Sequence, residues 1–245
     1  RSDVEIGATL SGGMDSSAIV CSAVHKQGKP LKTFSSYYAF LPELDERKWI
    51  EKILQKTFCL NYLVSPAAED AIRGWEKLTY YNDFPLAAGF VSQNAVMQEA
   101  HRQGIKVLLS GQGSDEISAG YRHSLYRYFA DLVRSMQIGR LAKELPEYLK
   151  KDNKAFSKLG KIMLSTFLPE SALYNLEFRY YRFEPFNRAF TREADKNCGE
   201  QILKKIADIR TSRLSNFLYN MMHNTSLQTL LHFEDRMAMA NSVES

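Results

Sequence analysis

The sequence predicts an α/β fold, with a Rossmann-like parallel sheet that has helices on both faces, followed by a mostly helical region packed on it. Short apolar runs alternate with amphipathic stretches through the first half, which is typical of parallel strands joined by crossover helices. Strand patterns then stop near residue 124. The chain has 245 residues, 44% of them hydrophobic, which suffices for one large domain or two small ones.

The first half provides the strands. The run IGATL, residues 6–10, predicts the first of them, and the helix that follows, 16–28, keeps apolar residues at helical spacing until Gly28 ends it. Further strands are expected at 32–40, 61–65 and 106–110, and further helices at 45–58, 67–81 and 91–104.

The second half is expected to be helical. Thr225 and Gln228 have the spacing of a capping box before the last helix. We therefore divide the chain into a nucleotide-binding α/β part, 1–123, and a helical part of the same domain, 124–245. Helical or helix-compatible stretches are 125–136, 140–151, 176–183, 200–209, 213–222 and 227–240.

Composition limits the possible settings and partners. The cysteines, Cys21, Cys59 and Cys198, form no CxxC or zinc-type spacing, so we expect reduced thiols and a cytoplasmic location. The formal net charge of +4 is too small to indicate nucleic acid, and no apolar run is long enough to predict a membrane span. The first residue is Arg1 and not Met, so we expect a fragment of a longer protein.

Two similar loops carry the chemistry. SGGMDSS, residues 11–17, follows the first strand, and SGQGSDEISAGY, residues 110–121, follows the strand at 106–110. Ligands of open parallel sheets bind beyond the carboxyl ends of the strands. Glycines allow close approach of the backbone, and the first amides of a helix favour an anion. The first loop therefore predicts a phosphate site, in which Ser11, Ser16 and Ser17 add hydroxyl donors.

The acids in these loops indicate a cation. The Walker pattern ends in Gly-Lys-Ser/Thr, whereas Met-Asp-Ser stands here. Asp15 and Asp115 together could hold Mg²⁺ between the protein and bound phosphates. The alternative is that each aspartate caps a turn or a helix; two matching loops favour the metal site. At Gly13, we expect a β-branched side chain to crowd the phosphate path and to resist any positive φ.

Three motifs resemble the synthetase domain of glutamine-hydrolysing asparagine synthetases, within the ATP pyrophosphatase superfamily. SGGMDS, 11–16, is similar to the SGGxDS motif of that superfamily. GQGSDEISAGY, 111–121, resembles the GEGxDE…GGY signature of the synthetases. DRMAMANSVES, 235–245, resembles the segment that precedes an Arg-x-Pro-Phe-Leu-Asp run in them. The order and spacing of the motifs fit over nearly the whole chain.

This resemblance implies a reaction and its partners. ATP with Mg²⁺ would activate the β-carboxylate of aspartate as β-aspartyl-AMP, with release of pyrophosphate. Ammonia from a glutaminase domain would then displace AMP to give asparagine. Nothing in this chain matches that N-terminal glutaminase domain, so we expect the synthetase part alone, and little product from glutamine. A homodimer stays open as the assembly.

The resemblance also assigns residues. It implies metal ligands at Asp15 and Asp115, and catalytic positions at Gln112, Glu116 and Arg236. Arg236 lies near a lysine that stabilises phosphate charge in related β-lactam synthetases; a local pair with Glu234 or Asp235 is the alternative. Contacts to ATP are implied at Leu10, Ser11, Gly12, Gly13, Asp15, Ser16, Ser36, Ser110 and Gly111.

Gln112 departs from the family pattern, which has glutamate between the two glycines. Glutamine can accept a hydrogen bond from an amine, but it cannot take the proton. A nucleotide-dependent, amide-forming domain remains our main hypothesis. Gln112 weakens the interpretation that asparagine is its product. The alternatives are a related ligase or cyclase that acts on another carboxylic acid, and a catalytically silent nucleotide-binding module.

Overall fold

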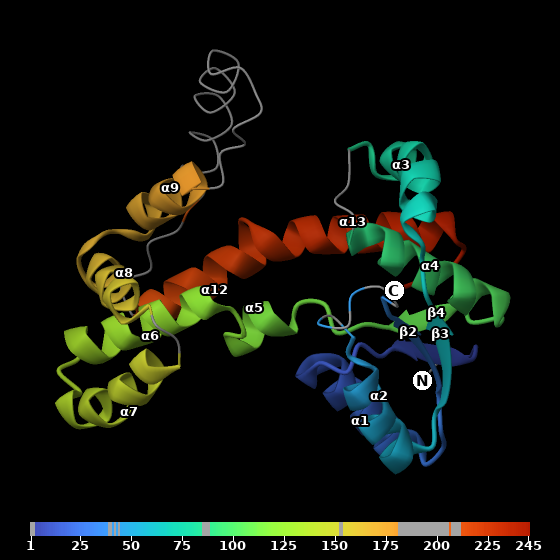
Figure 1. Cartoon of the computed structure of the whole chain (residues 1–245), viewed down its shortest axis with the longest axis horizontal. Helices are drawn as coiled ribbons and strands as arrows, with labels where there is room; N and C mark the ends of the chain where they lie inside the picture. Colours follow the sequence, from blue (N-terminus) through green and yellow to red (C-terminus); the bar gives the residue numbers. More distant parts are fainter. Residues whose placement is uncertain are drawn as a thin grey trace. The chain divides into compact units, whose positions relative to one another are not determined.

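The computed structural model describes residues 3–38, 41, 43, 45–84, 89–151, 154–180, 206 and 212–245. The chain forms two compact units (Figure 1), which we describe one at a time. Unit 1 comprises residues 1–112 and 229–245, and unit 2 comprises residues 113–228. By this division the last part of the chain belongs with the sheet.

Unit 1 contains a parallel sheet of four strands in the order β3-β2-β1-β4, which confirms the predicted fold class. Each expected strand is present, although the second ends at Ser36, before the expected residue 40. The strands are β1 (Ile6–Thr9), β2 (Lys32–Ser36), β3 (Leu60–Val64) and β4 (Val107–Leu109).

The helices of unit 1 follow the predicted alternation. Gly28 ends α1 in the left-handed region (φ 67°), and its N–H donates to the carbonyl of Val24 at 2.9 Å, as expected of a C-terminal glycine. The helices are α1 (Met14–Gln27), α2 (Arg47–Thr57), α3 (Ala68–Asn82), α4 (Gly89–Arg102) and most of α13 (Ser226–Ala240).

Each face of the sheet has its own apolar core. On one face, Ala8 and Leu10 of the β1 end pack with Val20 of α1 and Ile50 of α2. The other core joins strand residues to α4 and to the C-terminal end of unit 1, and contains Phe34, Val96, Met97, Ala100, Ile105, Leu108, Ala238 and Val243. Figure 1 shows α1 and α2 on the side of the sheet opposite α4. The helices therefore fix the strand ends from both sides.

The C-terminal segment extends the sheet beyond β4. Glu244 forms a parallel bridge with Val107, in which Glu244 N donates to Lys106 O and Leu108 N donates to Glu244 O, both at 2.8 Å. Residues more than 130 positions apart thus complete one layer.

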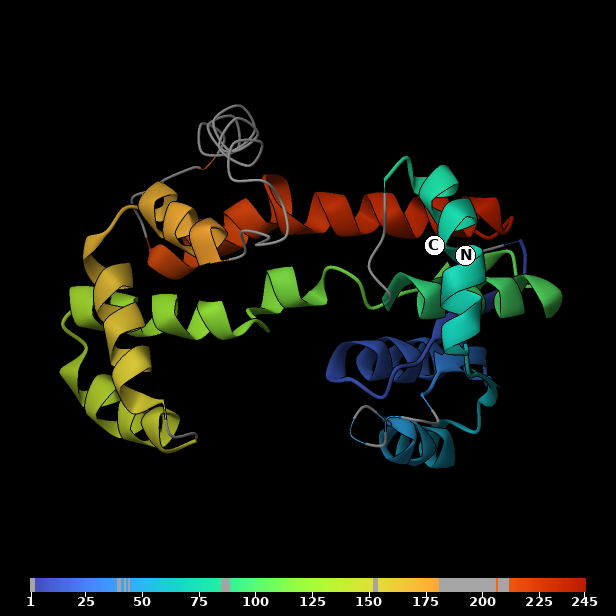
Figure 2. The same cartoon turned by 45° about the horizontal axis from the view of Figure 1, so that its top comes forward.

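Unit 2 is helical (Figure 2), as predicted for the second half. Its core includes Tyr126, Phe129, Leu132 and Ile162. A fully buried ion pair joins Arg127 Nε to Glu170 Oε1 at 2.9 Å. The helices are α5 (Ser114–Ser118), α6 (Arg122–Arg134), α7 (Ile138–Lys150), α8 (Ala155–Phe167), α9 (Glu170–Tyr180), α12 (Arg213–His223) and the start of α13.

The capping box expected before α13 stays a prediction, and the described hydrogen bonds of Thr225 and Gln228 go to the end of α12. The N–H of Thr225 donates to Asn220 O at 3.0 Å, and the Gln228 amide donates to His223 O at 2.6 Å. Both groups thus join the end of α12 to α13, because the two helices follow each other with almost no intervening loop.

Some expectations concern parts of the chain that the structure does not describe. Cys198, the helix at 200–209 except for residue 206, and the end of the helix at 176–183 lie outside the described residues. Cys21 and Cys59 are free thiols. Within the described ranges, no helix is both long and apolar enough to cross a membrane.

Candidate active site

The topology of the sheet brings the two glycine-rich loops to neighbouring strands. β1 pairs with β2 on one side and with β4 on the other, so the strand order reverses between β1 and β4. This is the switch point at which open parallel sheets bind ligands. The loop after β1 and the start of the loop after β4 therefore leave the sheet side by side.

A hydroxyl network holds the first loop. The Oγ atoms of Ser11 and Ser16 lie 3.0 Å apart, and Ser16 Oγ accepts the N–H of Ser11 at 3.2 Å. Gly13 N donates to Ser11 Oγ at 3.3 Å. Ser16 is buried, whereas Ser11 is exposed. Ser16 thus shapes the loop from inside, and Ser11 presents its hydroxyl to solvent.

The two glycines of the first loop have different roles. Gly12 has φ +81°, and a Cβ there would lie 3.0 Å from Trp49 Cβ and 3.1 Å from Glu46 O. Gly13 has φ −66°, so the positive φ considered for Gly13 belongs to Gly12. A Cβ on Gly13 would meet only Ser11 Oγ within 4 Å, at 3.3 Å. Gly12 therefore allows α2 to approach, and Gly13 keeps the outer side of the loop open.

The second loop begins against the start of α1. A Cβ on Gly111 would lie 3.2 Å from the backbone N of Ser16 and 3.6 Å from Asp15 Cβ. Gln112 donates its N–H to Ser110 Oγ at 3.2 Å, and its exposed side chain has no hydrogen bond to another described residue. The structure thus brings Ser110, Gly111 and Gln112 to the first loop, all within unit 1.

Neither predicted metal ligand caps its helix. The N-caps of α1 and α5 are Gly13 and Gly113, and neither helix start has a hydrogen bond from a capping side chain. Asp15 and Asp115 are instead the second residues of these helices. The carboxylate of Asp15 forms no hydrogen bond or ion pair with any other described residue. Asp115 is part of unit 2, where the missing Cβ of Gly120 leaves room for its carboxylate: a Cβ there would lie 1.8 Å from Asp115 Oδ1.

Glu116 lies at the centre of a buried hydrogen-bonded group in unit 2. It is 1% exposed, and its Oε1 accepts from Tyr121 Oη at 2.7 Å and from Ser226 Oγ at 2.8 Å. Burial, together with the hydrogen bond to Glu116, raises the pKa of Tyr121 to about 12. These contacts join α5 to the starts of α6 and α13, so Glu116 is placed to position its neighbour Asp115.

Tyr121 and Ser226 were not predicted as site residues. Tyr121 is the last residue of the second signature, and that position was the available signal. Ser226 lies 110 residues beyond Glu116, and nothing in the local sequence connects the two. Such a pair becomes visible only through the fold.

The remaining predicted positions differ in accessibility. Leu10 is fully buried in the core between sheet and helices, so it supports the loop from beneath. Ser36 is half-buried at the carboxyl end of β2. Arg236 pairs with Asp83 at 3.3 Å, both partly exposed, and not with Glu234 or Asp235, the partners expected as the alternative. A surface pair of this kind contributes little to stability, so the guanidinium can turn to another anion.

The residues of the first loop fit a nucleotide and a divalent cation. Free helix amides without a capping side chain, an open glycine, an exposed hydroxyl and an unpartnered carboxylate are suited to phosphate oxygens and Mg²⁺. Among the described residues, no three His, Cys, Asp or Glu side chains cluster as a metal site. The protein would thus supply only part of the coordination, as is usual for Mg²⁺ at bound phosphates.

The fold and the two loops define a class: an α/β protein with two glycine-rich loops at the switch point of a parallel sheet. Comparison with known proteins gives the particular family. The sequence model described as asparagine synthase matches residues 1–245, and the chain therefore belongs to the asparagine synthase family.

Individual relatives agree at low identity. A putative glutamine-hydrolyzing asparagine synthetase of Mycobacterium tuberculosis is 30% identical over 196 residues, 74% of this chain and 26% of that protein. The glutamine-hydrolyzing asparagine synthetase 2 of Bacillus subtilis is 23% identical and covers 100% of this chain and 29% of its own length. The amidase chry2 of Gibberella zeae is 30% identical over 135 residues, 49% of this chain and 20% of its own. The chain thus spans about a quarter of the length of these relatives.

Proposed function

We propose that this chain is the ATP-dependent synthetase part of an asparagine-synthetase-like enzyme. This part would activate a carboxylic acid as an acyl adenylate and transfer the acyl group to ammonia. Aspartate is the first candidate for the acid. The observation that carries the proposal is the meeting of the two loops at the switch point, where Gly111 packs on the start of α1 beside Asp15. Family membership supports the reaction class.

The residues of the first loop would bind the triphosphate. The first amides of α1 and the hydroxyl of Ser11 would donate to its oxygens, and Gly13 would let the chain approach. Asp15 from the first loop and Asp115 from the second would hold Mg²⁺, which neutralises phosphate charge. Ser36 and Ser110 would face the nucleoside end.

In the first step, an oxygen of the substrate carboxylate would attack the α-phosphorus. The bond from the α-phosphorus to the bridging oxygen would break, and pyrophosphate would leave. Negative charge grows on the α-phosphate in the transition state and is stabilised by fixed donors and cations. Arg236 is our candidate cation for this role, after release from Asp83.

In the second step, ammonia would attack the acyl carbon, and AMP would leave with its bonding electrons. The nitrogen must lose a proton, which Gln112 cannot accept. We therefore assign Gln112 a hydrogen-bonding role toward the amine, with the proton passing to solvent. Glu116 is a positioning residue, because its carboxylate is buried against Tyr121 and Ser226.

Exchange of labelled pyrophosphate into ATP tests the first step directly. We expect exchange that depends on both Mg²⁺ and aspartate, and that is lost in Asp15→Asn. Free ammonia in a second assay should release AMP and the amide, without any need for a glutaminase. Binding of Mg·ATP without acid-dependent exchange, across a panel of amino acids and other carboxylates, would favour the silent nucleotide-binding module.

The second candidate is a ligase or cyclase for another acid, and Gln112 favours it. The name of the amidase chry2 shows that relatives of this chain are not all called asparagine synthetases. Exchange that is strong with a different carboxylate and absent with aspartate would establish this alternative. A cytoplasmic location remains part of either proposal.

A further inference from the structure

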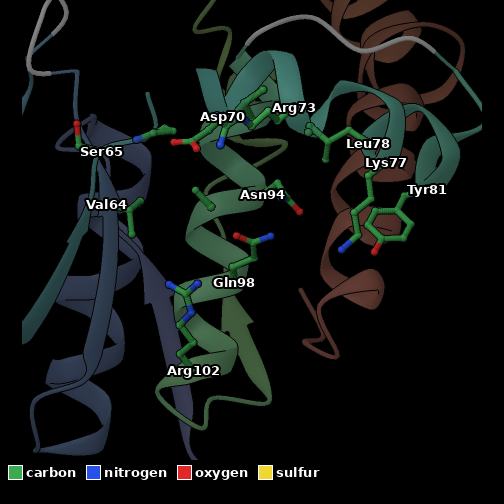
Figure 3. A pocket seen from close by; sticks show the side chains of 14 residues that line it. Val64, Ser65, Asp70, Arg73, Lys77, Leu78, Tyr81, Asn94, Gln98 and Arg102 are labelled. Atoms are coloured by element: carbon green, nitrogen blue, oxygen red, sulfur yellow. The ribbon is translucent and has the colours of Figure 1, made fainter. Parts of the chain in front are cut away.

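A cavity of about 460 Å³ lies in unit 1 away from the two loops, between α3, α4 and the end of β3. Figure 3 shows the side chains of Asn94, Gln98 and Arg102 in a row along α4, and those of Arg73 and Lys77 on the neighbouring α3. The volume is within the range of small-molecule sites, which is about 300–1,000 Å³. Buried Leu78 and Val91 contribute apolar surface to the wall.

The lining is unevenly charged. Arg73, Lys77 and Arg102 contribute three cations, and Asp70 is the one acid among the lining residues. The Asp70 carboxylate keeps its negative charge while its Oδ2 accepts the N–H of Ala67 at the start of α3 at 2.9 Å, but the three cations outnumber it among the described lining residues. The cavity therefore presents excess positive charge, which favours an anion.

The cations on α3 are not neutralised by neighbouring carboxylates. Arg73 forms no ion pair with any described residue, although Asp70 lies three positions before it. Lys77 has no ion pair with a described residue, and its Nζ lies 5.5 Å from the centroid of the Tyr81 ring. Two like charges one helical turn apart repel each other and destabilise a helix. An anion bound between them would remove that repulsion.

Amide groups on α4 add directional donors. Asn94 Oδ1 accepts from the Asn241 amide at 2.9 Å, which leaves the Nδ2 donors of Asn94 available to a ligand. The side-chain amide of Gln98 has no hydrogen bond to another described residue. Arg102 is held by Glu99 at 3.4 Å in an exposed pair, which contributes little and can open. Cations and amide donors thus line the same space from two helices.

We propose that this cavity binds a small organic anion, with its carboxylate or phosphate group between Arg73 and Lys77 and its carbon skeleton against Leu78 and Val91. The site is separate from the proposed nucleotide loop. Its ligand belongs to the class of carboxylates and phosphate esters, and the structure favours one larger than inorganic phosphate because the apolar wall extends beyond the cations.

Calorimetric titration at constant ionic strength tests the proposal, with citrate as the carboxylate probe and glucose 6-phosphate as the phosphate-ester probe. We expect at least one probe to bind, and the tighter one identifies the class. Arg73→Gln and Lys77→Gln should each weaken the binding of the tighter probe about tenfold, or about 1.4 kcal/mol. Lys77→Arg keeps the positive charge and should bind that probe as the parent does. All three substitutions are at exposed positions, so folding should be retained.

Two controls separate this site from other causes. Lys26→Gln removes an exposed cation from the last turn of α1 in the same unit and should leave binding unchanged. Lys56→Gln removes an exposed cation from the last turn of α2 in the same unit and should also leave it unchanged. The proposal is overturned if neither probe binds at up to about 10 mM, if Lys26→Gln weakens binding as much as Arg73→Gln, or if both cavity variants bind like the parent.

Discussion

The two glycine-rich loops have similar sequences and different structures. The first leads into a helix of fourteen residues, α1, and its acid, Asp15, has no partner among the described residues. The second leads into a helix of five residues, α5, and its second acid, Glu116, is buried and accepts two hydrogen bonds. The pattern of serine, glycine and acid thus leaves an acid without a described partner in the first loop and gives the second loop a buried, hydrogen-bonded acid.

This difference shows that the role of an acid in a glycine-rich loop cannot be assigned from its neighbours in the sequence alone. Asp115 and Glu116 are adjacent, yet one is half-buried beside Gly120 and the other is 1% exposed. A short helix explains this contrast, because adjacent residues of a helix point about 100° apart. Substitutions in the two loops should therefore separate effects on binding from effects on stability.

The largest effect is expected on metal-dependent nucleotide binding. Asp15→Asn and Asp115→Asn should each weaken Mg·ATP binding about a hundredfold or more, because even residues that only support metal ligands contribute 10–100-fold. Calorimetry with Mg²⁺ and with EDTA measures this, and unchanged thermal unfolding is the control. Wild-type affinity for Mg·ATP in both variants would exclude the shared metal site.

The free energy of unfolding should depend more on Glu116 of the second loop than on Asp15 of the first. Glu116→Ala should lower the free energy of unfolding by about 1–3 kcal/mol, because it leaves the hydroxyls of Tyr121 and Ser226 without their acceptor. Glu116→Gln keeps an acceptor oxygen and should cost less. Asp15→Ala is the matched substitution in the first loop and should cost least, since no described residue depends on Asp15. Urea unfolding compares the three, and equal losses would contradict the distinction between the two acids.

The glycines of the first loop should divide in the same way. Gly12→Ala should destabilise the protein by about 1–3 kcal/mol, because its φ is positive and α2 approaches closely. Gly13→Ala should change stability by less than about 1 kcal/mol. Gly13→Val should reduce ATP binding more than stability, since its side chain would fill the open side of the loop. An unfolded Gly13→Val protein would instead show that this glycine is structural.

The sequence was sufficient for the sheet and for the loops, and the reason is physical. The signals used were local: the periods of strands and helices, Gly28 and the two loop motifs. The elements that they predicted lie close to the expected residues. The contacts of Ser226 with Glu116 and of Asp83 with Arg236 join residues that lie far apart in the sequence, and no local pattern encodes them. Tyr121 differs, because it lies five positions after Glu116 within the second signature. The bonds of Thr225 and Gln228 to the end of α12 are further contacts that the capping-box pattern did not predict.

A smaller effect is expected at Gln112, whose side chain is exposed and has no partner among described residues. If hydrogen bonding is its role, Gln112→Glu should change acid-dependent pyrophosphate exchange and amide formation by less than about tenfold. General-base help is typically worth about 10²- to 10⁴-fold, so a gain of that size with aspartate and ammonia would contradict our assignment. Loss of activity with a different acid would indicate that glutamine is adapted to that substrate.

The smallest effect concerns Tyr121 in alkaline solution. Its pKa is raised to about 12 in the folded protein, first by burial and then by Glu116, whereas an unfolded tyrosine titrates near 10. The unfolded state therefore releases this proton at lower pH than the folded state. The contribution of Tyr121 to stability is complete below about pH 10 and is lost progressively as the pH rises toward 12. Tyr121→Phe removes this titration together with the hydrogen bond to Glu116, so its unfolding midpoint should be lower than that of the parent at pH 8 but should fall less between about pH 8 and about pH 11. Thermal unfolding of both proteins at the two pH values measures the difference. Equal decreases of the unfolding midpoint in the two proteins would show that Tyr121 does not donate a hydrogen bond to the buried Glu116 carboxylate. The contrast between the two loops would then depend on the contact of Ser226 with Glu116 alone.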